Sequence, residues 1–411
     1  MPSIKSYLIF LSLIFNHQLL AEWHNWAGNQ SCNPKKVWNP TTKEELISII
    51  KEAAKAHHKV SVMGTGHSFS AIACSDDYMI DMTGLNTILS VDKNLLRVRA
   101  QGGIRIQDLN KAIAHYDLAL SNLPAMGGMT LAGAVCTATH GTGHSGTLSS
   151  FITEIELISA DGVVHVLSAQ QNPELFKAAC VSLGTLGVIY CVTMQCEPLF
   201  MLDYVQKTMS LDELLAQYRQ LFQQSDYFQF RWQLRDDVVY ADSWHRINVK
   251  VQPNSSLSLK TSYDALQWDT STELGMACEI AVPLDLLPQA IAIIQKLVPQ
   301  WTQNGFALEE VVCRFVCADK NSYLSPAADY DVVYLNIGTD AEAKYYEFFK
   351  AFEEAMYSLN GRPHWGKVNF LDHEKCNELY GENFIKFTEI KNHIDPFNIF
   401  SNTSINQILG L

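Results

Sequence analysis

The chain has 411 residues, of which 47% are hydrophobic. This length can bury a sizeable core and predicts about two or three domains. The formal net charge of −13 at pH 7 argues against nucleic acid as a partner, because phosphates require a basic surface. We therefore expect a globular protein that does not bind nucleic acid.

The first 21 residues are typical of an export signal. Lys5 provides a positive charge, residues 7–15 form an uncharged apolar run, and the small residue Ala21 offers a cleavage site. The apolar run is shorter than the roughly 20 residues that cross a bilayer. We expect an exported protein with a cleaved signal, or a membrane-associated protein with an interfacial anchor. The alternative is a buried N-terminal segment.

The ten cysteines would permit disulfides in an exported protein, but their spacing identifies no framework. Cys313 and Cys317 lie in an apolar, strand-like run, where buried single cysteines are common. No pair has the spacing of a zinc ribbon, so we expect no metal site.

A helix is predicted shortly after Pro40. Thr41 can cap it, and Glu44, three residues on, would complete a capping box. One face of this helix then carries the apolar residues Leu46, Ile47, Ile50, Ala53 and Ala54. A β-rich run at residues 59–63 follows and ends in a loop, at a position where α/β folds place ligands.

That loop consists of small residues whose backbone amides can converge on an anion. Its two glycines would let a pyrophosphate approach the backbone, although taken alone such a loop is more often a tight surface turn. A second small-residue stretch at residues 127–143 lacks the large side chains of a packed core, so something bulky should lie against it. The first loop, with the end of the strand, reads Val62, Met63, Gly64, Thr65, Gly66, His67 and Ser68.

Residues 151–168 are predicted to form a hairpin, because Asp161 and Gly162 separate two β-branched runs. A helix is expected at 173–181 and a strand at 188–196. This mixture of hairpins and helices differs from the regular alternation of a Rossmann domain. The character changes near Glu197 and Pro198, where we place a domain boundary. Beyond it, a helix at 211–222 and β-rich runs at 228–234 and 332–337 predict an α+β domain.

The two small-residue stretches, together with Arg362-Pro363-His364-Trp365-Gly366-Lys367, resemble the vanillyl-alcohol oxidase type of FAD flavoproteins. Within this type the chain is similar to the aldonolactone oxidase and alditol oxidase branch. The resemblance runs from about residue 26 to about residue 409 and implies an α+β fold with a two-subdomain, PCMH-type FAD-binding domain and a substrate (cap) domain. The implied parts are an export signal or anchor (1–21), the FAD-binding domain (22–198), the substrate domain (199–360) and a C-terminal segment that returns to the FAD site (361–411).

The resemblance also implies which residues hold FAD. In this branch the histidine at the position of His67 often links covalently to the flavin, whereas an isolated histidine there would more often cap its own turn. Val188, with Gly184 and Gly187, lies where the family contacts the adenine half, although a simple helix-to-strand turn explains these three almost as well. The residues implied to line the isoalloxazine and diphosphate are Thr130, Val135, Ala138, Thr139, His140 and Gly141.

Three residues are implied to act on the substrate. Glu279 interrupts an apolar run and corresponds to the family glutamate that points at the substrate hydroxyl; the alternative is an exposed strand residue. Several family members carry an arginine two positions later, where this chain has Ala281, so we expect Arg314 to supply the guanidinium. Lys367 would stabilise negative charge on the reduced flavin, whereas without the motif it would be an ordinary surface lysine.

The expected reaction is FAD-dependent oxidation of a sugar-derived alcohol. A hydroxyl at C2 of an aldonolactone, or at C1 of an alditol, would lose its proton toward Glu279 and Lys367 while hydride passes to flavin N5. Dioxygen would then reoxidise the flavin and give hydrogen peroxide. One alternative is a flavin dehydrogenase that passes electrons to a carrier. Another is a catalytically silent flavin-binding accessory protein of envelope biogenesis, which the missing arginine at position 281 favours.

Overall fold

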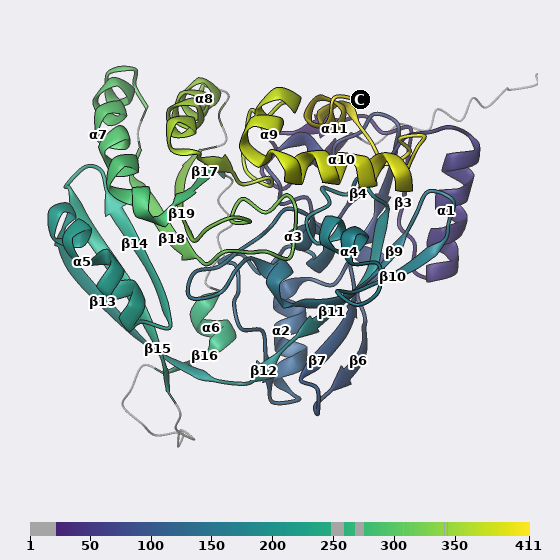
Figure 1. Ribbon diagram of the computed structural model, residues 1–411, viewed down its shortest axis with the longest axis horizontal. Coiled ribbons are helices and arrows are strands. Elements are labelled where there is room, and N and C mark those ends of the chain that lie inside the picture. The colour runs from purple at the N-terminus through teal and green to yellow at the C-terminus, as the bar shows by residue number, and fades with distance from the viewer. Residues whose placement is uncertain (1–21, 248–258, 268–274, 307, 341, 343) are drawn as a thin grey trace, which may run out of the picture.

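The computed structural model describes residues 22–247, 259–267, 275–306, 308–340, 342 and 344–411. The predicted export signal lies outside these residues. A large sheet forms one side of the molecule, and two smaller sheets with their helices form the other (Figure 1). The α+β fold expected from the sequence is confirmed.

The smallest of these three sheets is parallel, with the strand order β3-β5-β4. Helix α1 packs its apolar face in a cluster with β4 and β5, so the loop after β4 leaves from a supported strand end. Its elements are β3 (Lys36–Trp38), α1 (Lys43–Lys55), β4 (Val60–Met63) and β5 (Tyr78–Asp81).

The second sheet is antiparallel, with the order β10-β9-β11-β7-β6. Strands β9 and β10 form the hairpin predicted around Asp161 and Gly162, and Gly162 takes the positive φ of 76° that a tight turn needs. The strands are β6 (Ile88–Asp92), β7 (Arg97–Gln101), β9 (Ile152–Ile158), β10 (Val164–Leu167) and β11 (Val188–Gln195). The nearby helices are α2 (Ile106–Ala114), α3 (Leu131–Cys136) and α4 (Pro173–Ala179).

The large sheet is antiparallel and has eight strands, in the order β16-β13-β15-β14-β18-β19-β17-β20. Its strands are β13 (Met201–Ser210), β14 (Tyr227–Gln233), β15 (Val238–Ile247), β16 (Lys260–Thr261), β17 (Gly275–Pro283), β18 (Glu310–Val316), β19 (Val332–Asp340) and β20 (Arg362–Pro363). Helix α6 (Ser262–Leu266) follows β16.

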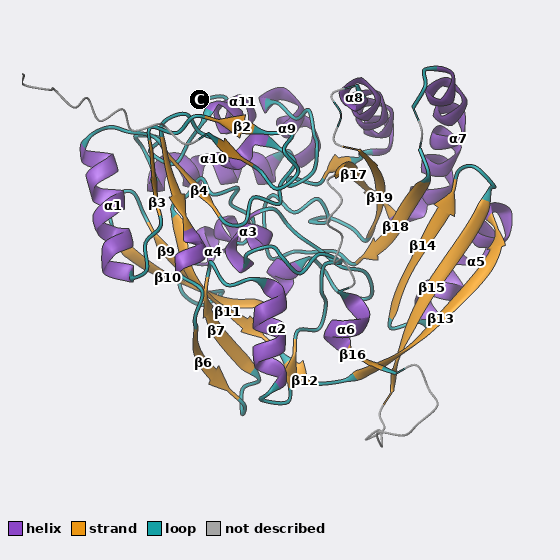
Figure 2. Cartoon of the chain, turned by 180° about the vertical axis from the view of Figure 1, so that it is seen from behind, coloured by secondary structure: helices purple, strands orange, loops and turns teal. Residues whose placement is uncertain are grey.

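One face of this sheet is covered by α5 (Leu211–Gln224), α7 (Leu287–Gln303) and α8 (Tyr345–Met356). Figure 2 shows these helices beside the sheet. Alternation along each strand sends the apolar side chains to the helix-covered face, as Val311, Cys313 and Phe315 of β18 illustrate. The intervening residues, including Arg314, therefore point to the opposite face. Two short antiparallel pairs complete the strands. One joins β1 (Trp23–His24) to β2 (Ser31–Cys32), and the other joins β8 (Leu118–Ala119) to β12 (Glu197–Pro198).

The C-terminal helices pack on the side of the smaller sheets (Figure 1). They are α9 (His373–Tyr380), α10 (Glu382–Ile394) and α11 (Thr403–Leu409). Phe384, Phe387 and Ile405 belong to the same buried cluster as Leu131 and Ala178. The chain therefore returns to its first part after forming the large sheet.

The predicted cap of α1 was wrong by one residue. Thr42, rather than Thr41, accepts the backbone N–H of Glu45, and the carboxylate of Glu45 accepts the backbone N–H of Thr41. Both registers satisfy the Thr-x-x-Glu pattern. Leu46 and Ile50 lie on the buried face with either cap, so the apolar pattern does not distinguish Thr41 from Thr42.

One disulfide is present in the described chain, between Cys32 and Cys74, with their Cα atoms 5.9 Å apart. It joins β2 to the segment after the glycine loop. Cys313 is a buried free thiol and Cys317 a half-buried one. No described helix combines the length and the apolar character needed to cross a membrane.

Candidate active site

A cavity of about 310 Å³ lies where the glycine loop, the second small-residue stretch and the large sheet meet. Most residues that the sequence assigned to a site border it. These are Val62, Met63, Gly64, Thr65, Gly66, His67, Ser68, Thr130, Thr139, His140, Glu279, Arg314 and Lys367. The three separated motifs therefore converge on one cavity.

The two small-residue stretches pack directly against each other. The hydroxyl of Thr65 donates to the carbonyl oxygen of Gly128 at 2.9 Å. A Cβ atom at Gly64 would lie only 1.9 Å from Oγ1 of Thr130, so this glycine makes room for the neighbouring loop. Gly66 has a φ of +70°, which glycine adopts without strain. Both glycines border the cavity, and Gly64 in addition makes the close contact between the loops possible.

His67 is held between the N-terminal segment and the second stretch. Its ring stacks on Trp26, with centroids 5.0 Å apart, and a Cβ atom at Gly128 would lie 3.0 Å from its Nε2. The backbone N–H of Trp26 donates to Gly66 O at 2.8 Å, and Asn25 Nδ2 donates to Ser68 O at 2.9 Å. Sequence reasoning missed this support, for which Trp26, in the connection between β1 and β2, was the available signal.

Four residues assigned to the cofactor do not border the cavity. Val135 and Ala138 belong to the buried core, and Val188 packs with Leu46 and other residues around α1, while its neighbour Ile189 reaches the cavity. Gly141 is pressed against Asn122, whose Oδ1 would lie 2.1 Å from an added Cβ. These positions support the lining residues from behind, because only alternate residues of a strand or one side of a helix can face a cavity.

Glu279 lies on β17 with its side chain only 2% exposed, and Nε2 of His140 lies 3.6 Å from its Oε2. His140 Nδ1 lies 2.8 Å from the carbonyl oxygen of Gly141, which can only accept, so Nδ1 carries a proton. Nε2 points at the carboxylate of Glu279, so a proton on Nε2 would lie between the two side chains. His140 and Glu279 therefore form a buried histidine–carboxylate pair.

This pair sets the ionisation of Glu279. Burial by itself raises the pKa of Glu279, but the charge and hydrogen bonding of His140 first, and then the charge of Lys367, outweigh burial and hold this pKa well below its usual range. Oε1 of Glu279 is buried and has no hydrogen-bond partner among the described residues. An ionised oxygen atom thus borders the cavity and can accept a proton from a bound hydroxyl group.

Lys367 reaches the cavity because its segment runs along the edge of β17. The backbone N–H groups of His364 and Val368 donate to the carbonyl oxygens of Glu279 and Ala277, each at 2.9 Å. Nζ of Lys367 lies 4.9 Å from the ring centre of Phe69, and the backbone N–H of Phe69 donates to Gly366 O at 2.8 Å. The loop of His67 and the segment of Lys367 are thus tied to each other.

His364 borders the cavity as well, a role the sequence reasoning did not give it. Burial lowers its pKa to about 3, so the ring is neutral. The backbone N–H of Gly366 donates to its Nδ1 at 2.9 Å, which places its proton on Nε2. His364 therefore offers a neutral N–H donor.

The same geometry bears on metal binding. Ligand atoms of His140, Glu279 and His364 lie within 4.8 Å of one another. A metal ion needs the lone pair of a deprotonated ring nitrogen. The hydrogen bond to Nδ1 of His364 places its proton on Nε2, and Nε2 of His140 points at the carboxylate of Glu279, so the three residues are arranged for proton chemistry. The absence of a metal site remains a prediction.

Arg314, on β18, also borders the cavity, as does Asn336 on β19. Burial lowers the pKa of Arg314, although the charge of Glu279 opposes this effect. Ala281 is buried beside Tyr334 and supplies no charge to the cavity. Asn336 was missed, yet it interrupts an apolar strand in the same way that singled out Arg314.

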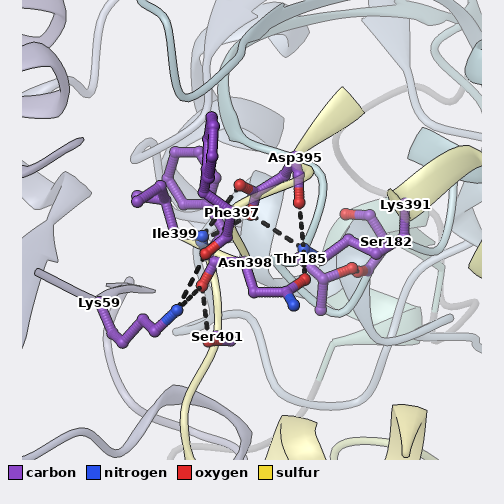
Figure 3. Close-up of polar contacts among 10 residues, drawn as sticks. Lys59, Ser182, Thr185, Lys391, Asp395, Phe397, Asn398, Ile399 and Ser401 are labelled. Carbon is purple, nitrogen blue, oxygen red and sulfur yellow. Dashed lines mark hydrogen bonds and ion pairs between the residues drawn. The ribbon is translucent and has the colours of Figure 1, made fainter. Parts of the chain in front are cut away.

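The C-terminal loop supports the strand that leads into the glycine loop (Figure 3). Lys59 Nζ donates to the carbonyl oxygens of Phe397 and Asn398, at 3.0 and 2.9 Å. The backbone N–H of Val60 donates to Ile399 O at 2.7 Å, and Asn402 Nδ2 donates to Ser61 Oγ at 3.0 Å. The predicted return of the C-terminal segment is present in these contacts.

A buried ion pair shapes this loop. Nζ of Lys391 lies 2.9 Å from Oδ2 of Asp395, and both side chains are 1% exposed or less. The carboxylate of Asp395 also accepts the backbone N–H groups of Ile399 and Phe400, at 2.9 and 2.8 Å. All charges in this pair are matched by hydrogen bonds, which is the condition for burying them.

Comparison with known proteins agrees with this geometry. Residues 34–168 match a family model described as an FAD binding domain, and residues 239–408 match one described as D-arabinono-1,4-lactone oxidase. An L-gulono-1,4-lactone dehydrogenase of Mycobacterium tuberculosis is 31% identical over 94% of this chain and 99% of its own. An L-gulonolactone oxidase of Scyliorhinus torazame is also 31% identical, over 94% of this chain and 98% of its own. In fold, the chain is similar to a cholesterol oxidase from B. sterolicum, with a TM-score of 0.81, 17% identity and coverage of 94% and 96% of the two chains.

Proposed function

The chain belongs to the family of FAD-linked aldonolactone oxidoreductases, and from this premise we propose that it oxidises a hydroxyl group of an aldonolactone such as D-arabinono-1,4-lactone. The observation that carries the proposal is the ionised Glu279, held by His140, in one cavity with Lys367 and Arg314. An alditol is the second substrate class, because an open-chain hydroxyl would meet the same groups.

Glu279 acts as the proton acceptor in this proposal. Its buried Oε1 has no partner among the described residues, so a substrate hydroxyl would provide the missing donor. The depressed pKa keeps Glu279 ionised at every ordinary pH, so Oε1 can accept a hydrogen bond from the substrate hydroxyl. The proton moves to Glu279 as the hydroxyl becomes more acidic with departure of the carbinol hydrogen. His140 keeps the carboxylate in place and charged.

Lys367 and Arg314 stabilise negative charge: Lys367 the charge that develops during the reaction, and Arg314 the partial charge on the oxygen atoms of the lactone. A fixed ammonium group stabilises charge that develops as the reaction proceeds, more than it stabilises neutral ground states. The guanidinium of Arg314 suits the ring and carbonyl oxygens of a lactone, since it offers several donors in one plane. Neutral His364 adds a donor beside Glu279.

FAD fits the remaining part of the cavity. Loop residues Gly64, Thr65 and Gly66 provide a small-residue wall, and the backbone at Gly184 and Gly187 borders the cavity without side chains. An added Cβ at Gly184 would meet open space, as expected where a ligand lies against the backbone. When bound, FAD supplies the acceptor for the hydride and returns the electrons to dioxygen, which gives hydrogen peroxide.

We also propose that FAD is linked covalently through His67. His67 borders the cavity on a loop fixed from both sides, which supports this proposal. Acid precipitation should leave flavin fluorescence in the protein pellet, and His67→Ala should release the flavin to the supernatant. A wild-type pellet without flavin would refute the covalent link and leave non-covalent binding intact.

The main experiment is a hydrogen peroxide screen of aldonolactones and alditols on the purified protein. Turnover of a lactone supports the proposal, and lack of turnover with any lactone or polyol would favour the silent accessory protein. The relatives include both a dehydrogenase and an oxidase at equal identity. Stopped-flow reoxidation by dioxygen decides between these, because a dehydrogenase would react slowly with oxygen and rapidly with an electron carrier.

Finally, we propose that the protein is exported. The apolar run at residues 7–15 after Lys5 motivates the proposal, and the Cys32–Cys74 disulfide supports it, because disulfides persist in oxidising compartments. Mass spectrometry of the protein from its native host should show that about the first 21 residues are missing. An intact N-terminus on protein from the cytoplasmic fraction would contradict export.

A further inference from the structure

A row of side chains crosses the large sheet on the face opposite to the helices, and most of its members are polar. Successive members are direct cross-strand partners, and such neighbours have Cβ atoms about 4.5–5.5 Å apart. The row ends beside Glu279 on β17. In strand order it contains Gln206, Asp242, Gln229, Arg314, Tyr334 and Ala281.

Two hydrogen bonds connect Arg314 to the interior of this row. Nε of Arg314 donates to Oε1 of Gln229 at 3.4 Å, and Nε2 of Gln229 donates to Oδ2 of Asp242 at 3.2 Å. Gln229 and Asp242 are 3% and 2% exposed. A guanidinium only donates and a carboxylate only accepts, so the amide of Gln229 has one orientation that satisfies both.

Asp242 is held firmly at the far end. It accepts Tyr204 OH at 2.6 Å and Gln206 Nε2 at 2.8 Å, and Nε of Arg231 lies 3.1 Å from its other oxygen. A carboxylate with this many donors cannot rotate without breaking several bonds. Gln229 is therefore anchored at its amide nitrogen and presents its oxygen to Arg314 in a fixed direction.

The position of Arg314 matters because Ala281, on the same row, contributes no charge. Among the described residues that border the cavity, Arg314 provides the guanidinium. Its long side chain has several rotatable bonds, and without other restraints substrate binding itself would have to order them at a cost in conformational entropy. Gln229 restrains Nε, from which the planar end of the side chain extends.

We propose that Gln229 and Asp242 are positioning residues for substrate recognition, which set the direction in which Arg314 presents its terminal amino groups to the oxygen atoms of the lactone. This inference rests on the proposed function. It explains how the chain can place a guanidinium from β18 where relatives of the resembled branch carry one on the strand of Glu279. Gln229 and Asp242 do not border the cavity, so they can affect substrate binding only through the position of Arg314.

The test is a double-mutant cycle on the holoenzyme. Gln229→Leu should raise KM for the lactone about tenfold and change the limiting rate of anaerobic flavin reduction by less than about threefold. The dissociation constant of a 2-deoxy aldonolactone, which lacks the reacting hydroxyl, should rise by the same factor in calorimetry. In an Arg314→Met background, Gln229→Leu should have no further effect on either constant.

Gln206→Leu is the matched control. It removes another donor to Asp242 from the exposed end of the row and leaves the Gln229–Arg314 contact in place, so both constants should stay unchanged. If Gln229→Leu does not fold, Asp242→Asn replaces it, because it keeps the side-chain volume. Asp242→Asn should raise KM and the dissociation constant of the 2-deoxy lactone, and it should have no further effect on either in the Arg314→Met background. Additive effects in the cycle would overturn the inference. Unchanged lactone binding in Arg314→Met would instead overturn the role of Arg314 in the proposed function.

Discussion

Removing the charge of His140 should make the reaction sensitive to acid. His140→Asn keeps an amide donor for the carbonyl oxygen of Gly141 and removes the positive charge beside Glu279. Two unit charges 3.6 Å apart attract by roughly 4–5 kcal/mol at an effective dielectric constant of about 20. At about 1.4 kcal/mol per pKa unit, this attraction corresponds to roughly three units as an upper limit.

The direction of the change follows from two opposing effects on the pKa of Glu279, namely burial and nearby positive charge. In the wild type the depressed pKa contributes stability above the unfolded value of about 4.3, and this contribution is lost as pH falls through the folded value. In His140→Asn, the effect of burial on Glu279 is opposed mainly by the charge of Lys367. The pKa of Glu279 therefore rises. The variant should therefore lose stability mostly at neutral pH, and its flavin reduction should slow as pH falls from about 7 to about 5.

Anaerobic stopped-flow reduction across pH 5–9 measures this effect, with urea unfolding at neutral and acidic pH as the companion measurement. Tyr334→Phe is the control. The ring of Tyr334 stacks on that of His140, with ring centroids 3.6 Å apart, and its buried hydroxyl has no hydrogen-bond partner among the described residues, so the substitution keeps the stacking and the charge of His140. This control should keep the wild-type pH profile. If the profiles of His140→Asn and the wild type coincide, the ion pair does not set the ionisation of Glu279.

Three further predictions concern other parts of the site. Lys367→Met should slow anaerobic flavin reduction by roughly 100- to 1,000-fold with FAD still bound, and a change in KM alone would make Lys367 a substrate anchor. Gly64→Ala should cost about 1–3 kcal/mol of stability in denaturant unfolding and weaken flavin retention, because its Cβ meets Thr130, whereas Gly338→Ala, with nothing within 4 Å, should be neutral. Cys32→Ser with Cys74→Ser should lower thermal stability by about 2–4 kcal/mol, and reducing agent should destabilise the wild type but leave this double variant unaffected.

Local patterns predicted much of the fold, because hairpins and helices depend on neighbouring residues. The turn at Asp161 and Gly162 joins the predicted strands, and the run at 59–63 ends at the expected glycine loop. The two small-residue stretches stand out from their surroundings, whereas the segment of Lys367 was identified through the family resemblance. The cap of α1 failed, since two overlapping Thr-x-x-Glu registers fit the sequence equally well.

Contacts between distant strands could not be predicted in the same way. His140 and Glu279 meet only after the large sheet has packed against the loop that carries His140. Val135, Ala138 and Gly141 share a small-residue stretch with Thr139 and His140, and sequence alone cannot tell which side of that stretch faces the cavity. Gln229 and Asp242 gave no local signal either, because their significance depends on the register between β14, β15 and β18.

The loop after α10 has a consequence for biosynthesis. Strand β4 lies at the edge of its sheet, and its outer side is completed by contacts such as that between Lys59 and Asn398, which are 339 positions apart. At about 5–20 residues per second, ribosomes need roughly 20–70 seconds to make the intervening chain. The glycine loop after β4 therefore lacks the support of the C-terminal loop during most of translation. Until then β4 presents an open edge that favours aggregation, so slow synthesis at low temperature and chaperones that shield strand edges should raise the yield of holoprotein.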